Sequence, residues 1–181
     1  APDIAEVFLA GHIPRASLFD IRYICDQHHP ELLMIPSASD FATTVSEMGI
    51  GNHHRIVVYD SGDMLNAGRV WWMFRTFGHS AVAVLDGGLP KWVAEGHETE
   101  DMPPIPRDRH MTVRLQNQLV RDVTHVAHAS KLGTPQIVDA RSAERFRRDA
   151  PEPREGLRAG QLPGARNVPY PLPFNGDKTM K

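Results

Sequence analysis

The sequence of 181 residues contains a single cysteine, Cys25, and this scarcity limits what the protein can be. One cysteine excludes an internal disulfide framework and favours a reducing compartment, so we expect a cytoplasmic protein. No apolar run approaches the roughly 18 residues that a membrane-spanning helix needs, and the acidic start has no basic region of the kind that opens a signal peptide. With a net charge of −2 and no basic stripe, the chain lacks the electrostatic footprint of a nucleic-acid-binding protein. We therefore expect neither a membrane nor nucleic acid as a partner.

The ten histidines do not stand at the spacing of metal ligands. His28-His29 and His53-His54 are adjacent pairs in polar stretches, and neither pair has a cysteine or carboxylate partner at ligand spacing. No other pattern in the sequence predicts a bound group. We expect no metal site and no cofactor.

Alternating helix and strand signals fill the first hundred residues. Residues 37–48 and 67–77 carry apolar side chains at helical spacing and are followed by glycine. Two short runs rich in valine, 55–59 and 81–85, have the composition of parallel strands that are buried on both faces. A further short helix is predicted from about residue 89 to residue 95. This alternation predicts an α/β fold with a parallel sheet flanked by helices.

One short phrase occurs near both ends of the chain, as GHIPRA at 11–16 and as GQLPGA at 160–165. Repetition at about one domain length indicates tandem domains. We assign residues 1–96 to a first domain, residues 97–120 to a linker rich in proline and charge, and residues 121–181 to the N-terminal part of a second domain. A strand-like run precedes only the second copy of the phrase. We therefore expect both domains to be incomplete and the chain to be the middle of a longer protein.

An ordered set of motifs covers nearly the whole chain. It consists of Gly11-His12-Ile13-Pro14, Phe19-Asp20-Ile21, Val57-Val58-Tyr59-Asp60, Gly68-Arg69-Val70-Trp71-Trp72-Met73-Phe74-Arg75, Phe77-Gly78-His79, Leu85-Asp86-Gly87-Gly88 with Trp92, and Asp139-Ala140-Arg141 leading to Pro151-Glu152-Pro153-Arg154. In this set and order the chain resembles the two-domain sulfurtransferases of the rhodanese and 3-mercaptopyruvate sulfurtransferase family. The resemblance implies tandem rhodanese-like domains.

The resemblance also implies a cysteine nucleophile that accepts sulfane sulfur and passes it on as a persulfide. In the family only the second domain carries this cysteine, and the spacing of the first domain places it beyond Lys181, so we expect the chain alone to be inactive. In the first domain Asp60 stands where the active domain has its cysteine, and we interpret it as a capping residue in an inactive loop. Cys25 is followed by no glycine-rich loop or helix start, so we interpret it as an inert thiol.

Arginines follow the predicted strand of the second domain. The resemblance implies that Arg145 and Arg154 hold the carboxylate and keto oxygen of a small anionic 2-oxo acid. The planar guanidinium suits such a ligand because it donates two parallel hydrogen bonds. From charge alone, the other interpretation is a solvated loop with Arg–Glu pairs of little energetic value.

Two functions stay open at this point. The first is a sulfurtransferase that moves sulfur from 3-mercaptopyruvate or thiosulfate to cyanide or to a thiol acceptor such as thioredoxin or a small thiol. The alternative is a catalytically inactive rhodanese-like module for binding or regulation. Members of the 3-mercaptopyruvate branch have an acid and a histidine thought to relay protons, and those places hold Arg22 and Leu33 in this sequence. We therefore predict no proton relay and no general base in the chain.

Overall fold

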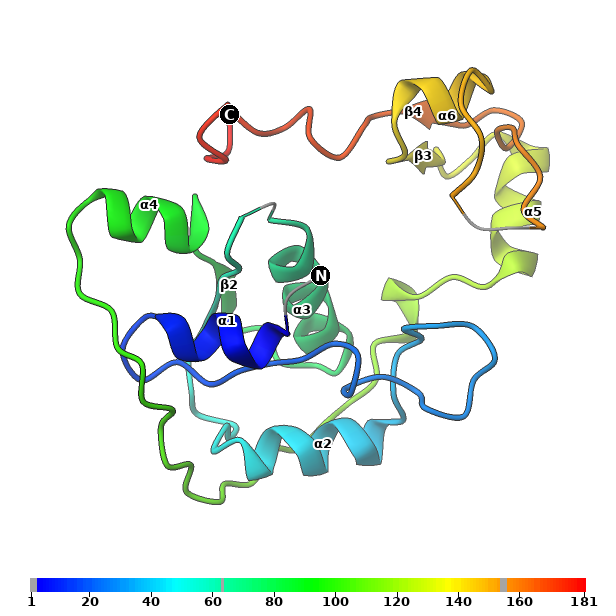
Figure 1. Ribbon diagram of the computed structural model, residues 1–181. Helices are drawn as coiled ribbons and strands as arrows, with labels where there is room; N and C mark the ends of the chain where they lie inside the picture. Colours follow the sequence, from blue (N-terminus) through cyan, green and yellow to red (C-terminus); the bar gives the residue numbers. More distant parts are fainter. Residues whose placement is uncertain (1–2, 63, 154–155) are drawn as a thin grey trace. The chain divides into compact units, whose positions relative to one another are not determined.

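The chain divides into two compact units, shown in a computed structural model that describes residues 3–62, 64–153 and 156–181 (Figure 1). The first unit consists of residues 1–116 with residues 177–179, and the second consists of residues 117–176 with residues 180–181. Each unit is described by itself. Among the described residues, no helix combines the length and the apolar character needed to cross a membrane.

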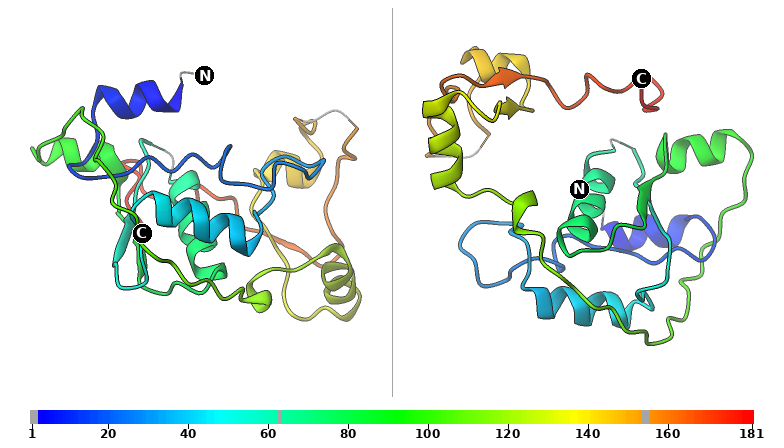
Figure 2. Two further views of the ribbon diagram at one scale, coloured as in Figure 1. Left: turned by 90° about the horizontal axis from the view of Figure 1, so that it is seen from below. Right: turned by 180° about the vertical axis from the view of Figure 1, so that it is seen from behind.

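The first unit has an α/β architecture around a pair of parallel strands. Its elements are, in chain order, α1 (Ile4–Ala10), α2 (Ala38–Glu47), β1 (Ile56–Val58), α3 (Leu65–Thr76), β2 (Val82–Val84) and α4 (Gly88–Ala94). Strand β1 pairs with β2 in parallel, with Ile56 opposite Val82. Helix α3 connects the two strands along the chain and contacts both of them (Figure 2). The alternating strands and helices predicted from the sequence are confirmed.

Local signals explain where the helices of this unit begin. The Ser37 hydroxyl accepts a hydrogen bond from the Asp40 backbone N–H at 3.1 Å, which caps α2. In the same way Asp3 caps α1 by accepting from the Ala5 N–H at 3.1 Å. The sequence analysis did not predict α1, because its seven residues are too few to establish a helical period.

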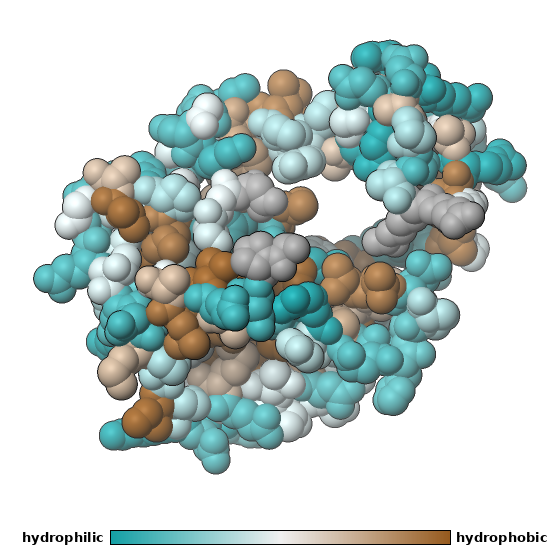
Figure 3. Space-filling view, viewed as in Figure 1, coloured by the Kyte–Doolittle hydropathy of each residue, from teal (hydrophilic) through white to brown (hydrophobic). Residues whose placement is uncertain are grey.

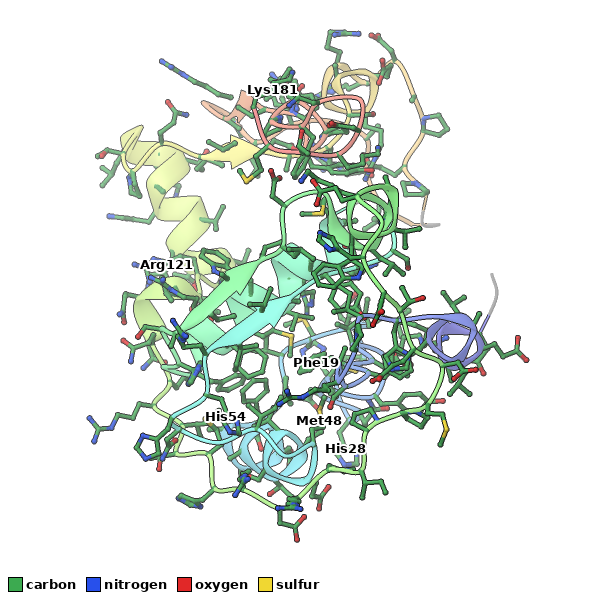
Figure 4. The ribbon with its side chains drawn as sticks, turned by 90° about the vertical axis from the view of Figure 1, so that its left-hand side faces the viewer. Phe19, His28, Met48, His54, Arg121 and Lys181 are labelled. Atoms are coloured by element: carbon green, nitrogen blue, oxygen red, sulfur yellow. The ribbon has the colours of Figure 1, made fainter. Side chains whose placement is uncertain are left out.

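The core of the first unit is built around stacked aromatic side chains. Phe41 of α2 is fully buried, and its ring stacks on Phe77 at 4.1 Å and meets the edge of Phe74 at 5.3 Å. Phe19 and Met48 pack against this cluster from neighbouring segments (Figure 4). Aromatic pairs add stability beyond the effect of the apolar area that they bury, so these ring contacts stabilise the packing of α2 against α3.

Part of the predicted linker belongs to the packing of the first unit. Met111 is buried in the core, and the Arg114 N–H donates to the Phe77 carbonyl at 2.9 Å. The carbonyl of Arg114 lies so close to Gly78 that a Cβ there would approach it to 2.7 Å. Gly78 also has φ +88°, a conformation that favours glycine. A glycine after α3 therefore allows the backbone at Arg114 to pack closely against the end of this helix. The second half of the linker is therefore part of the first unit and not a free connection.

The expectation that β1 is buried on both faces is wrong. Val57 is 60% exposed, and its partner across the sheet, Ala83, is exposed as well. Ile56 and Val58 point to the opposite face and pack against the core. In the described part of the unit, helix α3 is the element with substantial contacts to both strands, so one face of the pair stays open. Other large apolar side chains are also exposed, and several appear as brown areas among polar residues in the space-filling view (Figure 3).

The second unit repeats the parallel pairing on a smaller scale. It contains the 3-10 turn η1 (Asn117–Leu119), α5 (Val123–Leu132), β3 (Val138–Asp139), α6 (Ala143–Arg147) and β4 (Arg166–Asn167). Strands β3 and β4 are parallel, with Val138 opposite Arg166. Helix α5 begins after Asp122, because that carboxylate accepts from the His125 N–H at 2.8 Å.

The charged stretch after β3 contains a helix where the sequence analysis predicted only a loop. Helix α6 is five residues long, and the Ser142 side chain caps it by accepting from the Arg145 N–H. So short a helix leaves almost no periodic signal in the sequence. Its consequence is that Arg145 has a defined place on a regular element.

We predict that Phe41→Ala lowers the free energy of unfolding of the first unit by about 3–5 kcal/mol, because it leaves a cavity in the aromatic core. Urea denaturation followed by tryptophan fluorescence measures this, since the three tryptophans, Trp71, Trp72 and Trp92, all lie in the first unit. The control is Leu32→Ala, which removes an apolar side chain that is 76% exposed and is expected to change stability by about 0.5 kcal/mol or less. Equal losses in the two variants would contradict this account of the core.

Candidate functional site

The carboxylate of Asp60 lies just beyond the end of β1 and is enclosed by backbone donors. One oxygen, Oδ1, accepts from the N–H groups of Gly62 and Met64, each at 3.1 Å, and Oδ2 accepts from the Ala67 N–H at 3.0 Å. These donors come from the loop and the first turn of α3, where helical N–H groups have no partner within the helix. The loop is thus an anion cradle that its own aspartate fills. This geometry agrees with the interpretation of Asp60 as a capping residue.

The first residues of α4 pack on the same loop. The Leu89 N–H donates to the Asp60 carbonyl at 3.0 Å, and a Cβ on Gly88 would lie only 2.6 Å from that carbonyl oxygen. Gly88 also has φ +57°, which a residue with a Cβ adopts at a cost. Because β1 and β2 are parallel, their carboxyl ends bring this loop and the start of α4 to the same edge of the sheet.

Cys25 lies in a turn away from any helix start. Its Sγ is 3.2 Å from the Arg22 carbonyl oxygen and 3.0 Å from the Gln27 side-chain nitrogen. The cysteine is half-buried, and the charge of Arg69 also acts on it. Cys25 therefore has different surroundings from Asp60, whose carboxylate accepts three backbone N–H groups.

The two positions at which the family has its relay residues serve the packing of the first unit. Arg22 donates from Nε to Asp20 Oδ1 at 3.0 Å and from Nη2 to Oδ2 at 2.6 Å. These bonds lower the pKa of the buried Asp20 carboxyl. The Leu33 carbonyl accepts a hydrogen bond from Arg69, whose pKa is lowered by burial. Neither Arg22 nor Leu33 offers a group that could take up a proton at neutral pH.

A second cluster of charged side chains follows β3 in the second unit. Arg141 donates from Nε and Nη2 to the Asp139 carboxylate at 3.0 and 2.6 Å, and its own backbone N–H donates to Asp139 at 2.9 Å. The other edge of its guanidinium reaches Glu152 Oε1 at 2.7 Å and the Gly160 carbonyl at 2.7 Å. The Asn167 side chain closes the loop by donating to the carbonyls of Asp139 and Arg141, both at 2.9 Å. Arg141 is therefore committed to holding this loop together.

Arg145, which the resemblance assigns to substrate binding, joins the cluster through Glu152. Its Nη2 donates to Glu152 Oε2, while its Nε is buried and has no hydrogen-bond partner among the described residues. The other arginine of the prediction, Arg154, lies outside the described residues. In contrast, Arg147 and Asp149 form an exposed ion pair at 2.9 Å, of the kind expected for surface charge.

The electrostatics of the cluster keep its carboxylates ionised. Hydrogen bonds from Arg141 lower the pKa of Asp139, and hydrogen bonds first from Arg145 and then from Arg141 lower the pKa of Glu152. The Asp139 carboxylate in turn raises the pKa of Arg141. Two arginines and two carboxylates thus share a compact arrangement without net charge.

The sequence analysis did not assign Asp139, Arg141 or Glu152 to a site. One signal was present, because the pattern Asp-x-Arg occurs in the chain as Asp20-Ile21-Arg22 and again as Asp139-Ala140-Arg141. In both copies the arginine folds back on the aspartate with the same bidentate geometry. No local pattern could have brought in Glu152, because it lies 11 residues after Arg141.

The arrangement is suited to holding an anion or another acceptor and not a metal ion. Arg145 presents N–H donors, and the carboxylates near it are already paired with guanidinium groups. Throughout the part of the chain that the structure describes, no group of three or more histidine, cysteine, aspartate or glutamate side chains is placed to hold a metal ion.

Comparison with known proteins assigns a family to this architecture. Residues 3–95 match the family described as "Rhodanese-like domain". The chain is 39% identical to the 3-mercaptopyruvate sulfurtransferase of Escherichia coli strain K12, over 93% of this chain and 60% of that protein. It is 37% identical to thiosulfate/3-mercaptopyruvate sulfurtransferase 1, mitochondrial, of Arabidopsis thaliana, over 97% of this chain and 52% of that protein.

A solved structure agrees with this assignment. The crystal structure of SseA from Escherichia coli, described as having the "Rhodanese" fold of 3-mercaptopyruvate sulfotransferases, matches with a TM-score of 0.88 and 35% identity. The match covers 99% of this chain and 67% of that one. The chain spans between about half and three fifths of the length of the two curated relatives named above.

We predict that Asp60→Ala lowers the free energy of unfolding of the first unit by about 2 kcal/mol or more, because three backbone N–H groups lose their acceptor. Asp60→Asn keeps one acceptor oxygen and should cost less. Urea denaturation followed by tryptophan fluorescence tests both variants. Asp108→Ala is the control, because it removes an exposed carboxylate from the same unit. The cradle would be unimportant for stability if Asp60→Ala behaved like the control.

The lowered pKa of Asp139 predicts a dependence of the second unit on pH. A carboxyl group whose pKa is lower in the folded state stabilises that state above its ordinary pKa of about 4. This stabilisation is lost as the pH falls through the folded-state pKa. The backbone N–H groups of Arg166 and Val168 donate to the carbonyls of Ile137 and Asp139. We expect these two N–H groups to lose protection from hydrogen exchange below about pH 4, after correction for the intrinsic exchange rate. Asp139→Asn should be less protected at pH 7 and should lose less as the pH falls; an unchanged profile would contradict the assignment.

Proposed function

The chain belongs to the rhodanese-like domain family, and from that premise we propose that its protein is a sulfurtransferase that takes sulfur from 3-mercaptopyruvate, with thiosulfate as a further donor. The observation that carries this proposal is the 39% identity to the Escherichia coli 3-mercaptopyruvate sulfurtransferase over 93% of the chain. The placement of Arg145 on the short helix α6, with about 30% of its side chain exposed, supports a ligand of this kind. The acceptor would be cyanide or a thiol, from thioredoxin or from a small molecule.

The proposed reaction runs through a cysteine persulfide. A cysteine thiolate attacks the sulfur of 3-mercaptopyruvate, and the carbon–sulfur bond breaks with its electron pair remaining on carbon. The resulting enolate of pyruvate takes up the proton given up by the donor thiol. An acceptor thiolate or cyanide then attacks the outer sulfur of the persulfide, and the cysteine leaves as a thiolate. No cofactor is needed, because each step transfers sulfur between nucleophiles.

The two units have different roles in this proposal. In the first unit the cradle at the end of β1 is filled by Asp60, whose carboxylate cannot carry a persulfide. Cys25 lies outside any such cradle. We therefore place the nucleophile on a cysteine outside residues 1–181 and assign this chain the support and binding of the donor.

Arg145 is the donor-binding residue that the described structure supports best. Its guanidinium suits the carboxylate or keto oxygen of a 2-oxo acid because it offers directed N–H donors. Arg154 stays part of the proposal on the strength of the family resemblance. The remaining function to consider, a catalytically inactive binding or regulatory module, becomes the conclusion if the activity test below fails.

The test is an assay of pyruvate release and thiocyanate formation from 3-mercaptopyruvate and cyanide, catalysed by the purified full-length product of the gene. We expect turnover, and we expect Cys25→Ser to retain at least about half of it, because no step uses that thiol. Arg145→Ala should raise KM for 3-mercaptopyruvate about 10-fold or more, since a charge-assisted hydrogen bond to the donor is lost.

The control for this test is Arg147→Ala, which removes an exposed arginine from the same helix, α6. It should leave KM within about twofold of the wild-type value. Loss of activity in Cys25→Ser would move the nucleophile into this chain. Absence of turnover in the wild-type protein with both 3-mercaptopyruvate and thiosulfate would replace the proposed enzyme with a binding module.

A further inference from the structure

Arg141 and Arg145, the two arginines of the charged cluster in the second unit, differ in how many hydrogen bonds they make to the protein. Arg141 meets protein acceptors on all sides, namely Asp139, Glu152 and the Gly160 carbonyl. Arg145 makes one hydrogen bond with its guanidinium, to Glu152, and its Nε is buried without a partner among the described residues. About 30% of the Arg145 side chain is exposed, and its guanidinium carries further N–H donors, so Arg145 can also donate to a ligand, whereas most donors of Arg141 are taken up by the protein.

Glu152 lies between these two arginines. Its side chain is only 5% exposed, and each carboxylate oxygen accepts from a different guanidinium, Oε1 from Arg141 and Oε2 from Arg145. Arg141 is itself fixed by the bidentate contact with Asp139. A continuous chain of hydrogen bonds therefore runs from the end of β3 through Arg141 and Glu152 to Arg145.

Fixing an arginine in this way matters for binding. A free arginine side chain loses rotamer entropy when it grips a ligand, and a guanidinium that is already held loses less of it. The contact to Glu152 fixes Nη2, so it also determines which part of the guanidinium remains for a ligand. Because two carboxylates balance the two arginines, attraction by net charge is weak here and directed hydrogen bonds have to provide the affinity.

We propose that Glu152 is a positioning residue, which holds the guanidinium of Arg145 in one orientation, with its exposed part presented to the 2-oxo acid part of the sulfur donor. This inference rests on the proposed function, since that function supplies the ligand. Glu152 does not touch the donor itself and acts only through Arg145. Removing its charge should therefore weaken donor binding without affecting any later step.

The test measures binding and not turnover, with pyruvate as the probe because it carries the 2-oxo acid group and no sulfur to transfer. Full-length protein labelled with nitrogen-15 is titrated with pyruvate, and the Nε–H signal of Arg145 is assigned by its absence from Arg145→Lys. We expect that signal to shift on binding in the wild-type protein. In Glu152→Gln the amide faces one guanidinium with N–H groups, so one of the two ion-pair contacts is lost, and pyruvate should bind about 10-fold more weakly.

The matched control is Asp149→Asn, which also replaces a carboxylate with an amide in the same segment. Asp149 pairs with Arg147 in an exposed contact away from Arg145, so pyruvate affinity should stay within about twofold of the wild-type value. If Glu152→Gln does not fold, Glu152→Asp takes its place, because it keeps the charge but is too short to reach both arginines. Its pyruvate affinity should fall by a similar factor.

A double-mutant cycle separates positioning from a merely structural role. If Glu152 acts through Arg145, then Glu152→Gln should change pyruvate affinity less than about twofold when Arg145 is already alanine. An equal loss in the presence and absence of Arg145 would overturn the inference, as would wild-type affinity in Glu152→Gln or no shift of the Arg145 signal with pyruvate. Failure of the proposed function is a different result, namely absence of sulfur transfer by the protein while pyruvate binding follows the expected pattern.

Discussion

The carboxylate of Asp60 accepts three backbone N–H groups at the end of β1, and the edge of the first unit is organised around this contact. The N-cap residue of α3 is Met64, whose side chain makes no hydrogen bond to the helix. The carboxylate of Asp60 accepts from the N–H groups of Met64 and Ala67 in its place. The start of α4 then packs on the same loop through Gly88. A change at Asp60 therefore affects the connection from the sheet to both helices that follow it.

A cradle of this kind has one occupant at a time. N–H groups at the start of a helix favour a negative charge, and a thiolate or a carboxylate can provide it. In this chain the carboxylate of Asp60 is part of the protein, so this cradle is already occupied and its loop is held in place. In the charged cluster of the second unit, Arg141 donates to several protein acceptors, whereas Arg145 donates from its guanidinium to Glu152 and has a buried Nε without a partner among the described residues.

The order of helices and strands could be predicted from the sequence because its signals are local. Ser37 caps α2, Gly78 follows α3, and runs rich in valine form β1 and β2. The expectation of a strand buried on both faces was wrong at Val57, since burial depends on what packs against the sheet and not on the composition of the strand. The short helix α6 was missed because five residues carry too little periodic signal.

The sequence by itself determined the family, the alternation of β1, α3, β2 and α4 and the place of Asp60 after β1, because ordered motifs and local capping signals are contained in short stretches of chain. It also indicated Arg145 as a residue of interest. Tertiary structure decided which groups surround this residue, since Glu152 meets Arg145 from 7 residues away and Arg141 reaches the Gly160 carbonyl across 19. Whether a guanidinium N–H is paired or left open depends on contacts between segments that only folding brings together.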